Sequence, residues 1–567
     1  MTLLQALRRQ GLRRLVLCPG SRSGPLASAA GHLASRGELR LTTAIDERSA
    51  GFLALGMATA AGNAVAVVTT SGTAVANLLP AVVEADRSTQ PLLLLTADRP
   101  QRLKDCGANQ TVNQERFLLP ACRWCWSDAP AGLHDQSVEQ LLGLAQEAWT
   151  HAQGTAESAA GPVHLNLPFE EPLHASAFDS AEPLLPSAPL RTSGSTGDQA
   201  IDQTVDAAAL PLLKTDQPGV VIAGPWRGLM PSLSSYRSAV RRWLEISGWP
   251  LFADPLAALP VDLPGRIHHW ELLLESLPVP ANCQVLRLGP LPASRRLESW
   301  LQSREGTQLL ITEGEQRRLD ALSMAQQWSG GVASWIAAQQ QTGQSPPLDW
   351  MVKDQCLAEQ LDTSLPMAGQ ISEPGLAYQL PRLLPEGLPV MLAASSPVRD
   401  WLVWSGSAGS DRRCFSFRGA SGIDGTLSLA MGLSIELGPL TLLTGDLALL
   451  HDSNGWLLGG RDGPPLLVVL IDNGGGGIFE QIPMEPIPAE VFDRLFAMPQ
   501  QVDPLALAAA HGVEGRTVSC LEDLPENLAW GLAQGRPTLL RLVTDRKADA
   551  ALRQTLRTAA RNAEPFC

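Results

Sequence analysis

Residues 466–479 read LLVVLIDNGGGGIF, an unbroken apolar run that ends in Asp472, Asn473 and four consecutive glycines. Leucine- and valine-rich runs of this length are typical of strands that are buried on both faces of a parallel sheet. Because glycine has no Cβ atom, the backbone after such a strand can approach a phosphate closely and offer it N–H groups. The stretch therefore predicts a buried parallel strand that opens into a ligand-binding turn.

A second strand-like run, 442–444, ends in the pair Gly445-Asp446. Asp446 precedes Asn473 by 27 positions (473 − 446), and one βα connection of that length can return the chain to the same sheet edge. Carboxylate and amide oxygens suit Mg²⁺, which readily shares its oxygen shell with a diphosphate, and a glycine carbonyl such as that of Gly475 can join them. Each motif alone is common in ordinary turns, but together they predict a magnesium site.

Short apolar runs followed by Gly, Ser or Thr and then a helical pattern recur along the chain, as in parallel βα units. The predicted strands are 15–17, 65–68, 92–95, 220–223, 285–288, 309–312, 389–393, 442–444, 466–471 and 539–543. Two breaks without hydrophobic periodicity, at about 173–199 and 339–347, read as linkers. We therefore expect an α/β protein with three α/β domains and mainly parallel sheets, at 1–180, 200–340 and 350–567.

The formal net charge of −14 and an isoelectric point near 5.2 argue against a nucleic-acid partner, which would require a basic patch. Any anionic ligand must therefore be held by locally placed arginines. No apolar run approaches the ~18 to 20 residues of a membrane helix, and the start of the chain lacks a secretory signal. We expect a cytoplasmic protein without a membrane span.

Nine cysteines, an odd number spread along the chain, are typical of reduced thiols. Cys122 and Cys125 form a CxxC pair, a spacing used in zinc and redox sites. The sequence shows neither a second cysteine pair nor a nearby histidine that would complete four zinc ligands. We therefore assign this pair no role.

The Gly445-Asp446 pair and the Asn473 turn resemble the metal motif of the thiamine-diphosphate enzymes, although Leu447 and Gly474 depart from its commonest residues. The resemblance implies pyrimidine-binding, central and diphosphate-binding domains. It also implies thiamine diphosphate and Mg²⁺ as cofactors, with active sites between the subunits of at least a homodimer.

Thiamine chemistry requires a carboxylate that hydrogen-bonds the aminopyrimidine ring, since this prepares the cofactor to lose its thiazolium proton. The resemblance places Glu47 in that role, in Asp46-Glu47-Arg48 before an apolar helix at 50–61. Its local sequence alone favours an ordinary acid at the start of a helix, where the helix dipole stabilises it, and only the rest of the pattern reverses that interpretation.

Six blocks in order narrow the resemblance to the branch of this family that consumes isochorismate in menaquinone and phylloquinone synthesis. The blocks are PGSRS (19–23), DER (46–48), TSGTAVAN (70–77), TADRP (96–100), DCGANQ (105–110) and RGASGIDG (418–425). That branch decarboxylates 2-oxoglutarate and adds the succinyl carbanion equivalent to isochorismate in a conjugate addition. Two rival hypotheses are another thiamine-diphosphate carboligase, such as acetolactate synthase, and a non-catalytic binding module on the same scaffold.

Both substrates of that branch carry two carboxylates, and arginines bind carboxylates with two hydrogen bonds. The resemblance assigns isochorismate contacts to Ser21, Arg22, Asn109, Gln110 and Arg296, and places Ser395 and Arg399 at the substrate carboxylates near the cofactor. Arg99, Arg295 and Arg418 lie in or beside the same motifs and complete the predicted substrate set. Arg295 and Ala394 depart from the branch's usual lysine and asparagine.

The implied catalytic residues are Glu47, Arg22, Arg399, Ser395 and Gln110. The implied metal ligands are Asp446, Asn473 and Gly475. The remaining cofactor contacts are Gly445, Gly476, Ile478 and Phe479, of which the last two would pack beside the thiazolium and exclude water.

Overall fold

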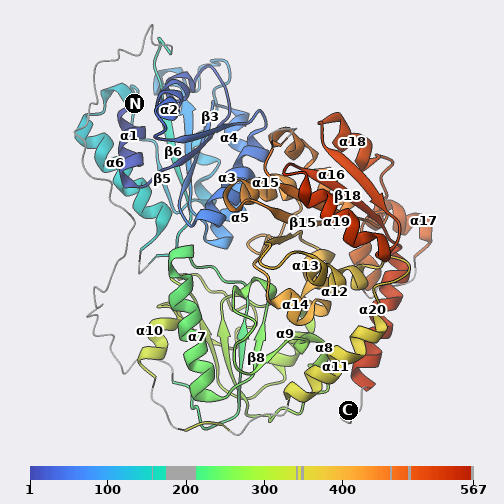
Figure 1. Ribbon diagram of the computed structural model, residues 1–567. Helices are drawn as coiled ribbons and strands as arrows, with labels where there is room; N and C mark the ends of the chain where they lie inside the picture. Colours follow the sequence, from blue (N-terminus) through green and yellow to red (C-terminus); the bar gives the residue numbers. More distant parts are fainter. Residues whose placement is uncertain are drawn as a thin grey trace. The chain divides into compact units, whose positions relative to one another are not determined.

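The computed structural model describes residues 1–155, 158–173, 212–339, 343–345, 350–459, 463–482, 485 and 487–562. It contains three six-stranded sheets (Figure 1). The chain forms two compact units, Met1–Val205 with Arg418–Leu437, and Asp206–Phe417 with Gly438–Cys567. The three parallel sheets confirm the predicted α/β class. Most of the predicted linker at 173–199 lies outside the described residues.

The first unit contains a parallel sheet of order β2-β1-β3-β4-β6-β5. Its strands are β1 (Arg14–Leu17), β2 (Arg40–Thr43), β3 (Val65–Thr69), β4 (Leu92–Asp98), β5 (Trp124–Trp126) and β6 (Pro162–Pro168). One face of this sheet shares an apolar core with α1 (Thr2–Gln10), α2 (Gly24–Ser35) and α6 (Val138–Gln153). α3 (Glu47–Ala61), α4 (Thr73–Ala76) and α5 (Leu79–Ser88) follow the carboxyl ends of β2 and β3.

A late segment of the chain belongs to this first unit, because α15 (Thr426–Leu437) packs against α3. Glycines set their close approach: a Cβ on Gly56 would lie 2.2 Å from the Leu429 carbonyl oxygen, and one on Gly432 would lie 2.1 Å from that of Leu53. Larger residues at either glycine would force the two helices apart. Helix α3, which begins at Glu47, is therefore packed against a segment from the later part of the sequence.

The second unit contains two parallel sheets, of order β12-β11-β10-β7-β8-β9 and β14-β13-β15-β16-β18-β17. The strands of the middle sheet are β7 (Gly219–Ala223), β8 (Leu251–Ala253), β9 (Arg266–Ile267), β10 (Gln284–Leu288), β11 (Gln308–Ile311) and β12 (Gln326–Trp328). The strands of the last sheet are β13 (Val390–Leu392), β14 (Cys414–Phe415), β15 (Leu440–Gly445), β16 (Leu466–Asp472), β17 (Glu514–Val518) and β18 (Thr538–Val543).

Helices cover both sheets of the second unit. They include α7 (Leu233–Ser247), α8 (Trp270–Leu273), α9 (Arg295–Gln302), α10 (Val332–Ala337), α11 (Trp350–Ser364), α12 (Glu373–Leu383), α13 (Ser396–Trp404), α14 (Gly406–Ser410), α16 (Asp446–His451), α17 (Ala489–Phe492), α18 (Pro504–Ala510), α19 (Leu524–Ala533) and α20 (Arg546–Asn562). Helix α20 contacts both α8 and α12, so it links the middle sheet's helices to those of the last sheet (Figure 1).

All the strands predicted from apolar runs are present, and the strands that were not predicted are mostly short or polar. β6 is completely buried yet carries His164 and Asn166, whose polar side chains interrupt the apolar pattern. β5 pairs with β6 and places Cys125 opposite His164. Strand pairing thus brings a histidine close to the CxxC pair from 39 positions away (164 − 125). Among the described residues, no group of three or more His, Cys, Asp or Glu side chains could hold a metal ion. No described helix is long and apolar enough to span a membrane.

Candidate active site

β15 and β16 carry the predicted metal motif to one sheet edge. Gly445 pairs in register with Ile471, so Asp446 and Asn473 leave neighbouring strands at the same end. Asp446 Oδ2 accepts a hydrogen bond from the backbone N–H of Gly475 at 2.7 Å, and its Oδ1 accepts one from Leu447. The structure thus joins the GD pair to the glycine turn directly.

The turn after β16 requires glycine at some positions and merely accepts it at others. Gly474, Gly475 and Gly476 have φ values of +75°, +86° and +28°. A Cβ on Gly475 would lie 2.0 Å from the Ala497 carbonyl oxygen, so no other residue fits there. Gly474 has a left-handed conformation that asparagine also adopts, so this position is compatible with either residue.

The side-chain oxygen of Asn473 indicates that this turn binds a ligand. Its Nδ2 donates to Glu373 Oε1 at 2.7 Å, whereas its buried Oδ1 accepts no hydrogen bond from any described residue. Burial also raises the pKa of Asp446, although the N–H groups of Leu447 and Gly475 oppose that shift. An orphaned amide oxygen and a desolvated carboxylate fit a divalent cation, which would satisfy both.

Residues that the sequence analysis did not identify stabilise this turn. Arg546 donates to the Gly474 carbonyl at 3.0 Å and to Glu480 at 3.1 Å. Glu373, which bonds Asn473, is buried and paired with Arg553, and Arg553 also pairs with buried Asp400. These residues lie on α12, α13 and α20, and no local motif in the sequence marks them.

Three carboxylates surround the single Arg553, and the third is Asp549 of α20. Asp549 is 2% exposed, its Oδ1 accepts a hydrogen bond from the Glu373 backbone N–H, and its Oδ2 has no partner among the described residues. Burial, followed by the charge of Glu373, raises the pKa of Asp549 to about 7. Asp549 therefore exchanges its proton near neutral pH, inside a buried cluster that contains one arginine.

We expect this pKa to make the protein less stable as the pH rises from about 4 to 8, because the folded state binds the Asp549 proton more tightly than the unfolded state does. Relative to Asp549→Asn, the wild-type protein should lose roughly 2 to 4 kcal/mol of unfolding free energy across this range. Denaturant unfolding of both proteins at pH 4, 6 and 8 measures the difference. Parallel pH profiles of the two proteins would show that Asp549 ionises normally.

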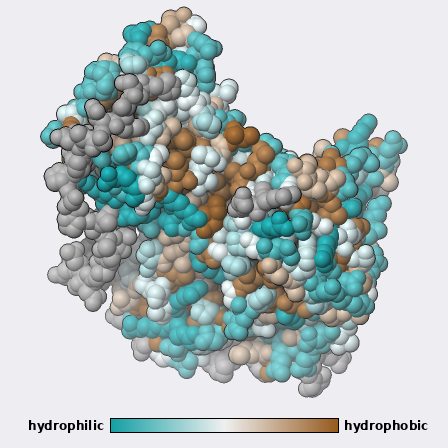
Figure 2. Space-filling view, turned by 45° about the horizontal axis from the view of Figure 1, so that its top comes forward, coloured by the Kyte–Doolittle hydropathy of each residue, from teal (hydrophilic) through white to brown (hydrophobic). Residues whose placement is uncertain are grey.

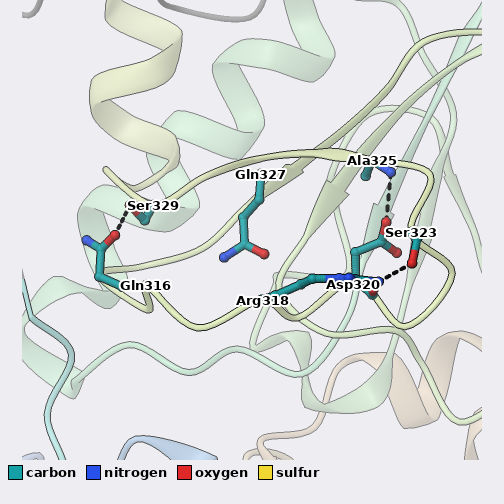
Figure 3. Close-up of a pocket in the computed structure, with 7 residues that line it drawn as sticks. All are labelled: Gln316, Arg318, Asp320, Ser323, Ala325, Gln327 and Ser329. Carbon is teal, nitrogen blue, oxygen red and sulfur yellow. Dashed lines mark hydrogen bonds between the residues drawn. The ribbon is translucent and has the colours of Figure 1, made fainter.

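A cavity of about 340 Å³ opens at the metal motif and is lined by residues that include Asp446, Asp472, Gly474 and Arg541. A larger cavity of about 460 Å³ lies in the loops after β11 and β12, in the middle sheet (Figure 3). Its polar groups bond one another: the Ser329 hydroxyl donates to Gln316 Oε1, and the Ala325 backbone N–H donates to Asp320 Oδ2. We therefore place the candidate site at the smaller cavity, because Asp446 and Gly474 of the metal motif line it.

The other predicted residues of the second unit lie on three helical segments. Ser395 caps α13 with φ +73°, a strained conformation for serine, and its carbonyl accepts a hydrogen bond from Arg399 at 2.7 Å. Ile478 and Phe479 are half-buried after the glycine turn, and Phe479 lies 5.6 Å from the Phe496 ring centre.

Arg295 and Arg296 begin α9 of the middle domain. Arg295 is exposed, whereas Arg296 is engaged by Glu271 and Glu275 at 3.4 and 3.1 Å. A substrate would have to compete with these two glutamates for Arg296, so its contact with isochorismate stays a prediction.

In the first unit, Glu47 is the first residue of α3 and directly follows the N-cap residue Asp46. Asp46 accepts hydrogen bonds from the N–H groups of Arg48 and Ser49, so Asp46 caps the helix and the Glu47 side chain is left for other contacts. Glu47 is half-buried, and its Oε2 accepts a hydrogen bond from Asn77 at 3.5 Å. The DER and TSGTAVAN blocks thus meet at this carboxylate.

Two of the predicted arginines in this unit are neighbours. Arg22 is buried and donates to the Phe169 carbonyl at 2.9 Å, while Arg99 donates to Ser71 and to the Gln110 carbonyl. Burial, and then the charge of Arg22, lowers the pKa of Arg99. Adjacent guanidinium groups repel each other, so an anion beside them would be bound favourably.

The remaining predicted residues of the first unit lie on loops. Gln110 adopts φ +55° and returns a hydrogen bond to the Ser71 carbonyl at 2.8 Å, whereas Ser21 and Asn109 are exposed. Arg418 is half-buried, and the N–H groups of the three residues after it bond the Glu84 carboxylate of α5.

Family models match all three parts of the chain. They are the N-terminal TPP binding domain of thiamine pyrophosphate enzymes at residues 1–117, the middle domain of thiamine pyrophosphate enzymes at 198–390, and their C-terminal TPP binding domain at 404–542. The fold and the metal motif therefore define a thiamine pyrophosphate enzyme.

Closer relatives identify the branch. The chain is 64% identical to the 2-succinyl-5-enolpyruvyl-6-hydroxy-3-cyclohexene-1-carboxylate synthase of Synechococcus sp. (strain CC9902), over 99% of this chain and 100% of that protein. It is 57% identical to the synthase of the same name from Prochlorococcus marinus (strain MIT 9313), over 96% of this chain and 97% of that protein. The chain belongs to the family of these synthases.

Solved structures show the same fold at low sequence identity. A putative thiamin diphosphate-dependent enzyme from Mycobacterium smegmatis superposes with a TM-score of 0.65 at 18% identity, over 96% of this chain and 98% of that chain. Benzoylformate decarboxylase from Polynucleobacter necessarius has the same TM-score at 16% identity and the same coverage.

Proposed function

We propose that the protein decarboxylates 2-oxoglutarate with thiamine diphosphate and Mg²⁺ and transfers the remaining succinyl unit to isochorismate, in menaquinone or phylloquinone synthesis. The observation that carries this proposal is end-to-end identity of 64% with a synthase of that name. The Asp446 carboxylate and the orphaned Asn473 oxygen support it, because they match the cation that such a cofactor needs.

Each residue has a role that its own chemistry supports. Asp446, Asn473 and the Gly475 carbonyl would hold Mg²⁺, and Glu47 would hold a proton against the pyrimidine of the cofactor. The bound cofactor supplies the electron sink for decarboxylation. Arg22 and Arg99 would bind carboxylates of isochorismate, while Arg399 and Ser395 would position the 2-oxo acid.

Exposed apolar side chains near the predicted residues favour a homo-oligomer with shared active sites. Ile45, two residues before Glu47, is 74% exposed, and Val112, two residues after Gln110, is 41% exposed. The face of the molecule in Figure 2 also shows brown apolar patches among hydrophilic residues. Such patches are typical of surfaces that a partner covers.

A direct assay tests the function. Purified protein is incubated with thiamine diphosphate, Mg²⁺, 2-oxoglutarate and isochorismate, and the loss of isochorismate absorbance is followed. We expect turnover only when all four are present. Consumption of pyruvate in place of 2-oxoglutarate would instead support a carboligase of the acetolactate synthase type, and no turnover with intact cofactor binding would support a binding module.

Arg399→Ala should raise the KM for 2-oxoglutarate about tenfold, because it removes one charge-assisted hydrogen bond to a carboxylate. Arg399→Lys keeps the charge and should lose less. Steady-state kinetics with 2-oxoglutarate as the varied substrate give the values. An unchanged KM and kcat in Arg399→Ala would remove this residue from the site.

A further inference from the structure

The CxxC pair of the first unit is built into a site of its own. Cys122 follows a 3₁₀ turn and Cys125 lies in the middle of the edge strand β5, and their thiols lie close enough to interact. His164 of β6 lies opposite Cys125, and its side chain interacts with the Cys125 thiol. Both cysteines are half-buried, so small reagents can reach them.

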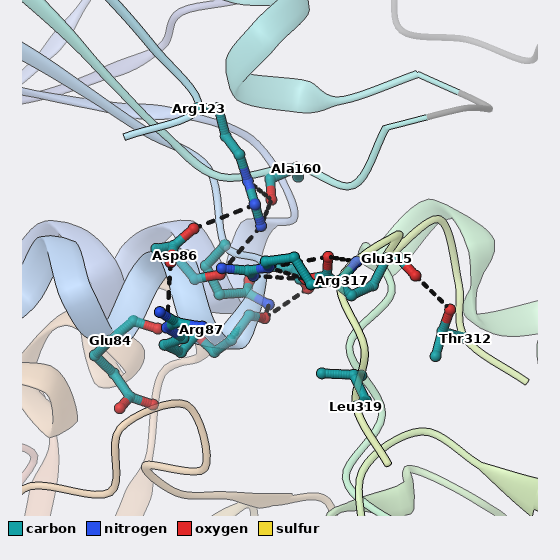
Figure 4. Close-up of polar contacts among 12 residues, drawn as sticks. Glu84, Asp86, Arg87, Arg123, Ala160, Thr312, Glu315, Arg317 and Leu319 are labelled. Atoms are coloured by element: carbon teal, nitrogen blue, oxygen red, sulfur yellow. Dashed lines mark hydrogen bonds and ion pairs between the residues drawn. The ribbon is translucent and has the colours of Figure 1, made fainter. Parts of the chain in front are cut away.

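The two residues between the cysteines fix the loop. Arg123 forms an ion pair with Asp86 of α5 at 3.2 Å and hydrogen bonds with the Asp86 and Ala160 carbonyls (Figure 4). The next residue, Trp124, stacks on His151 with the ring centres 5.4 Å apart. These contacts fix the backbone between the two cysteines, whose thiols interact with each other. An intramolecular disulfide requires such closeness.

The two thiols differ in acidity. The hydrogen bond from the Cys122 thiol, and after it that from His164, lowers the pKa of Cys125 to about 5 although burial opposes the shift. The pKa of Cys122 is raised by its bond to Cys125 and by burial. Cys125 is therefore the more acidic of the two thiols and the one that ionises first, and a thiolate is the form that attacks disulfides.

A buried polar network leads from this pair to the predicted substrate loop of the same unit. His164 Nε2 bonds the Thr96 hydroxyl at 2.7 Å, and Thr96 bonds Asn166 at 3.2 Å. Asn166 accepts a hydrogen bond from Gln114 at 2.8 Å and donates one to Asp98 at 2.8 Å.

The far end of the network holds the loop. Gln114 Oε1 accepts the Gly72 N–H at 2.8 Å, and Asp98 accepts the Arg99 N–H and pairs with Lys104. Asp98, Thr96 and Gln114 are completely buried. Water therefore cannot replace a hydrogen bond of this network that is lost when His164 changes its contacts. The loop held in this way carries Arg99 and Gln110.

We propose that Cys122 and Cys125 form a reversible thiol–disulfide site whose oxidation loosens the loop that carries Arg99 and Gln110. In the reaction, the Cys125 thiolate attacks a small-molecule disulfide and releases one thiolate from it. Cys122 then loses its proton to solvent and its sulfur attacks Cys125 Sγ, which releases the second thiolate. Two protein thiols are oxidised and one external disulfide is reduced to two thiols. The resulting disulfide removes the partner of His164.

The chemical step is tested with glutathione. The full-length holoenzyme is equilibrated at several ratios of reduced to oxidised glutathione, free thiols are alkylated, and the peptides are identified by mass spectrometry. We expect a Cys122–Cys125 disulfide that reduced glutathione reverses. Cys122→Ser should trap a mixed disulfide between Cys125 and glutathione. Cys125→Ser should form neither the intramolecular disulfide nor this mixed disulfide.

Cys520 provides the control thiol, because a hydrogen bond to Asp523 raises its pKa. Cys520→Ser should therefore oxidise like the wild-type protein. Absence of the Cys122–Cys125 disulfide at every glutathione ratio overturns the proposal.

The effect on the loop is tested by hydrogen exchange at residues 96–116 and by the KM for isochorismate. In the oxidised wild-type protein, exchange should speed up and the KM should rise by about fivefold. The Cys122→Ser/Cys125→Ser double variant, treated alike, should show neither change. The KM measurement rests on the proposed function, whereas hydrogen exchange does not. A protein without this activity would therefore still show by hydrogen exchange whether oxidation loosens the loop. A disulfide that leaves the exchange of this loop unchanged overturns the proposal.

Discussion

Glu47→Gln should lower kcat by roughly 10² to 10⁴-fold, the usual contribution of a positioned acid or base. Glutamine occupies the same space and can keep the hydrogen bond with Asn77, but it cannot hold a proton against the pyrimidine. The cofactor should still bind, since its diphosphate would be held by the Asp446 turn. Steady-state turnover of isochorismate and cofactor titration by fluorescence separate the two properties.

The neighbouring acid supplies the control for this experiment. Asp46→Asn also removes one negative charge from the start of α3, and asparagine caps a helix as well as aspartate does. Asp46→Asn should therefore keep most of the activity and the same melting temperature. Equal losses in the two variants would show that the charge at the helix start matters, and that Glu47 has no specific role.

The fold was predictable because buried parallel strands leave a strong signal. The apolar runs at 65–68, 92–95 and 466–471 all became strands whose side chains are almost entirely buried. β6 was missed because it is buried despite its polar residues, and those residues are satisfied by partners on β4 and in the loop after it. Satisfaction by distant partners cannot be recognised from local composition.

The part of the candidate site that lies at strand ends was also predictable, and the part that lies on distant helices was not. Asp446, Asn473 and the glycines lie at strand ends, so parallel pairing alone brings them together. Glu373, Arg546 and Arg553 lie on helices far away in the sequence, and only packing brings them to the turn. The sequence also gave no sign that Arg296 already has two glutamate partners.

The missed residue with the largest expected effect is Glu373. Asn473 can present its oxygen to a cation only while its amide nitrogen points the other way, and the bond from Nδ2 to Glu373 fixes that orientation. Arg553 in turn holds Glu373, so the amide is oriented by a buried ion pair. Residues that orient metal ligands typically contribute 10- to 100-fold to metal affinity.

Glu373→Ala should therefore weaken Mg²⁺ binding by roughly 10- to 100-fold, and the apparent affinity for thiamine diphosphate should fall with it. Titration of the protein with Mn²⁺, followed by electron paramagnetic resonance, reports the affinity without any turnover. Glu373→Gln still offers an oxygen to Asn473 and should recover part of the loss. That recovery distinguishes orientation of the amide from general damage to the fold.

Asp400→Asn is the matched control, because Asp400 shares Arg553 with Glu373 but is not a hydrogen-bond partner of Asn473. Each variant leaves Arg553 with one ion-paired carboxylate and with Asp549 nearby, so the two should lose similar amounts of unfolding free energy. Only Glu373→Ala should lose metal affinity, since only that change frees the Asn473 amide to rotate. Equal metal affinities in the two variants would mean that the backbone of the turn, clamped by Asp446 and Arg546, orients Asn473 without help from Glu373.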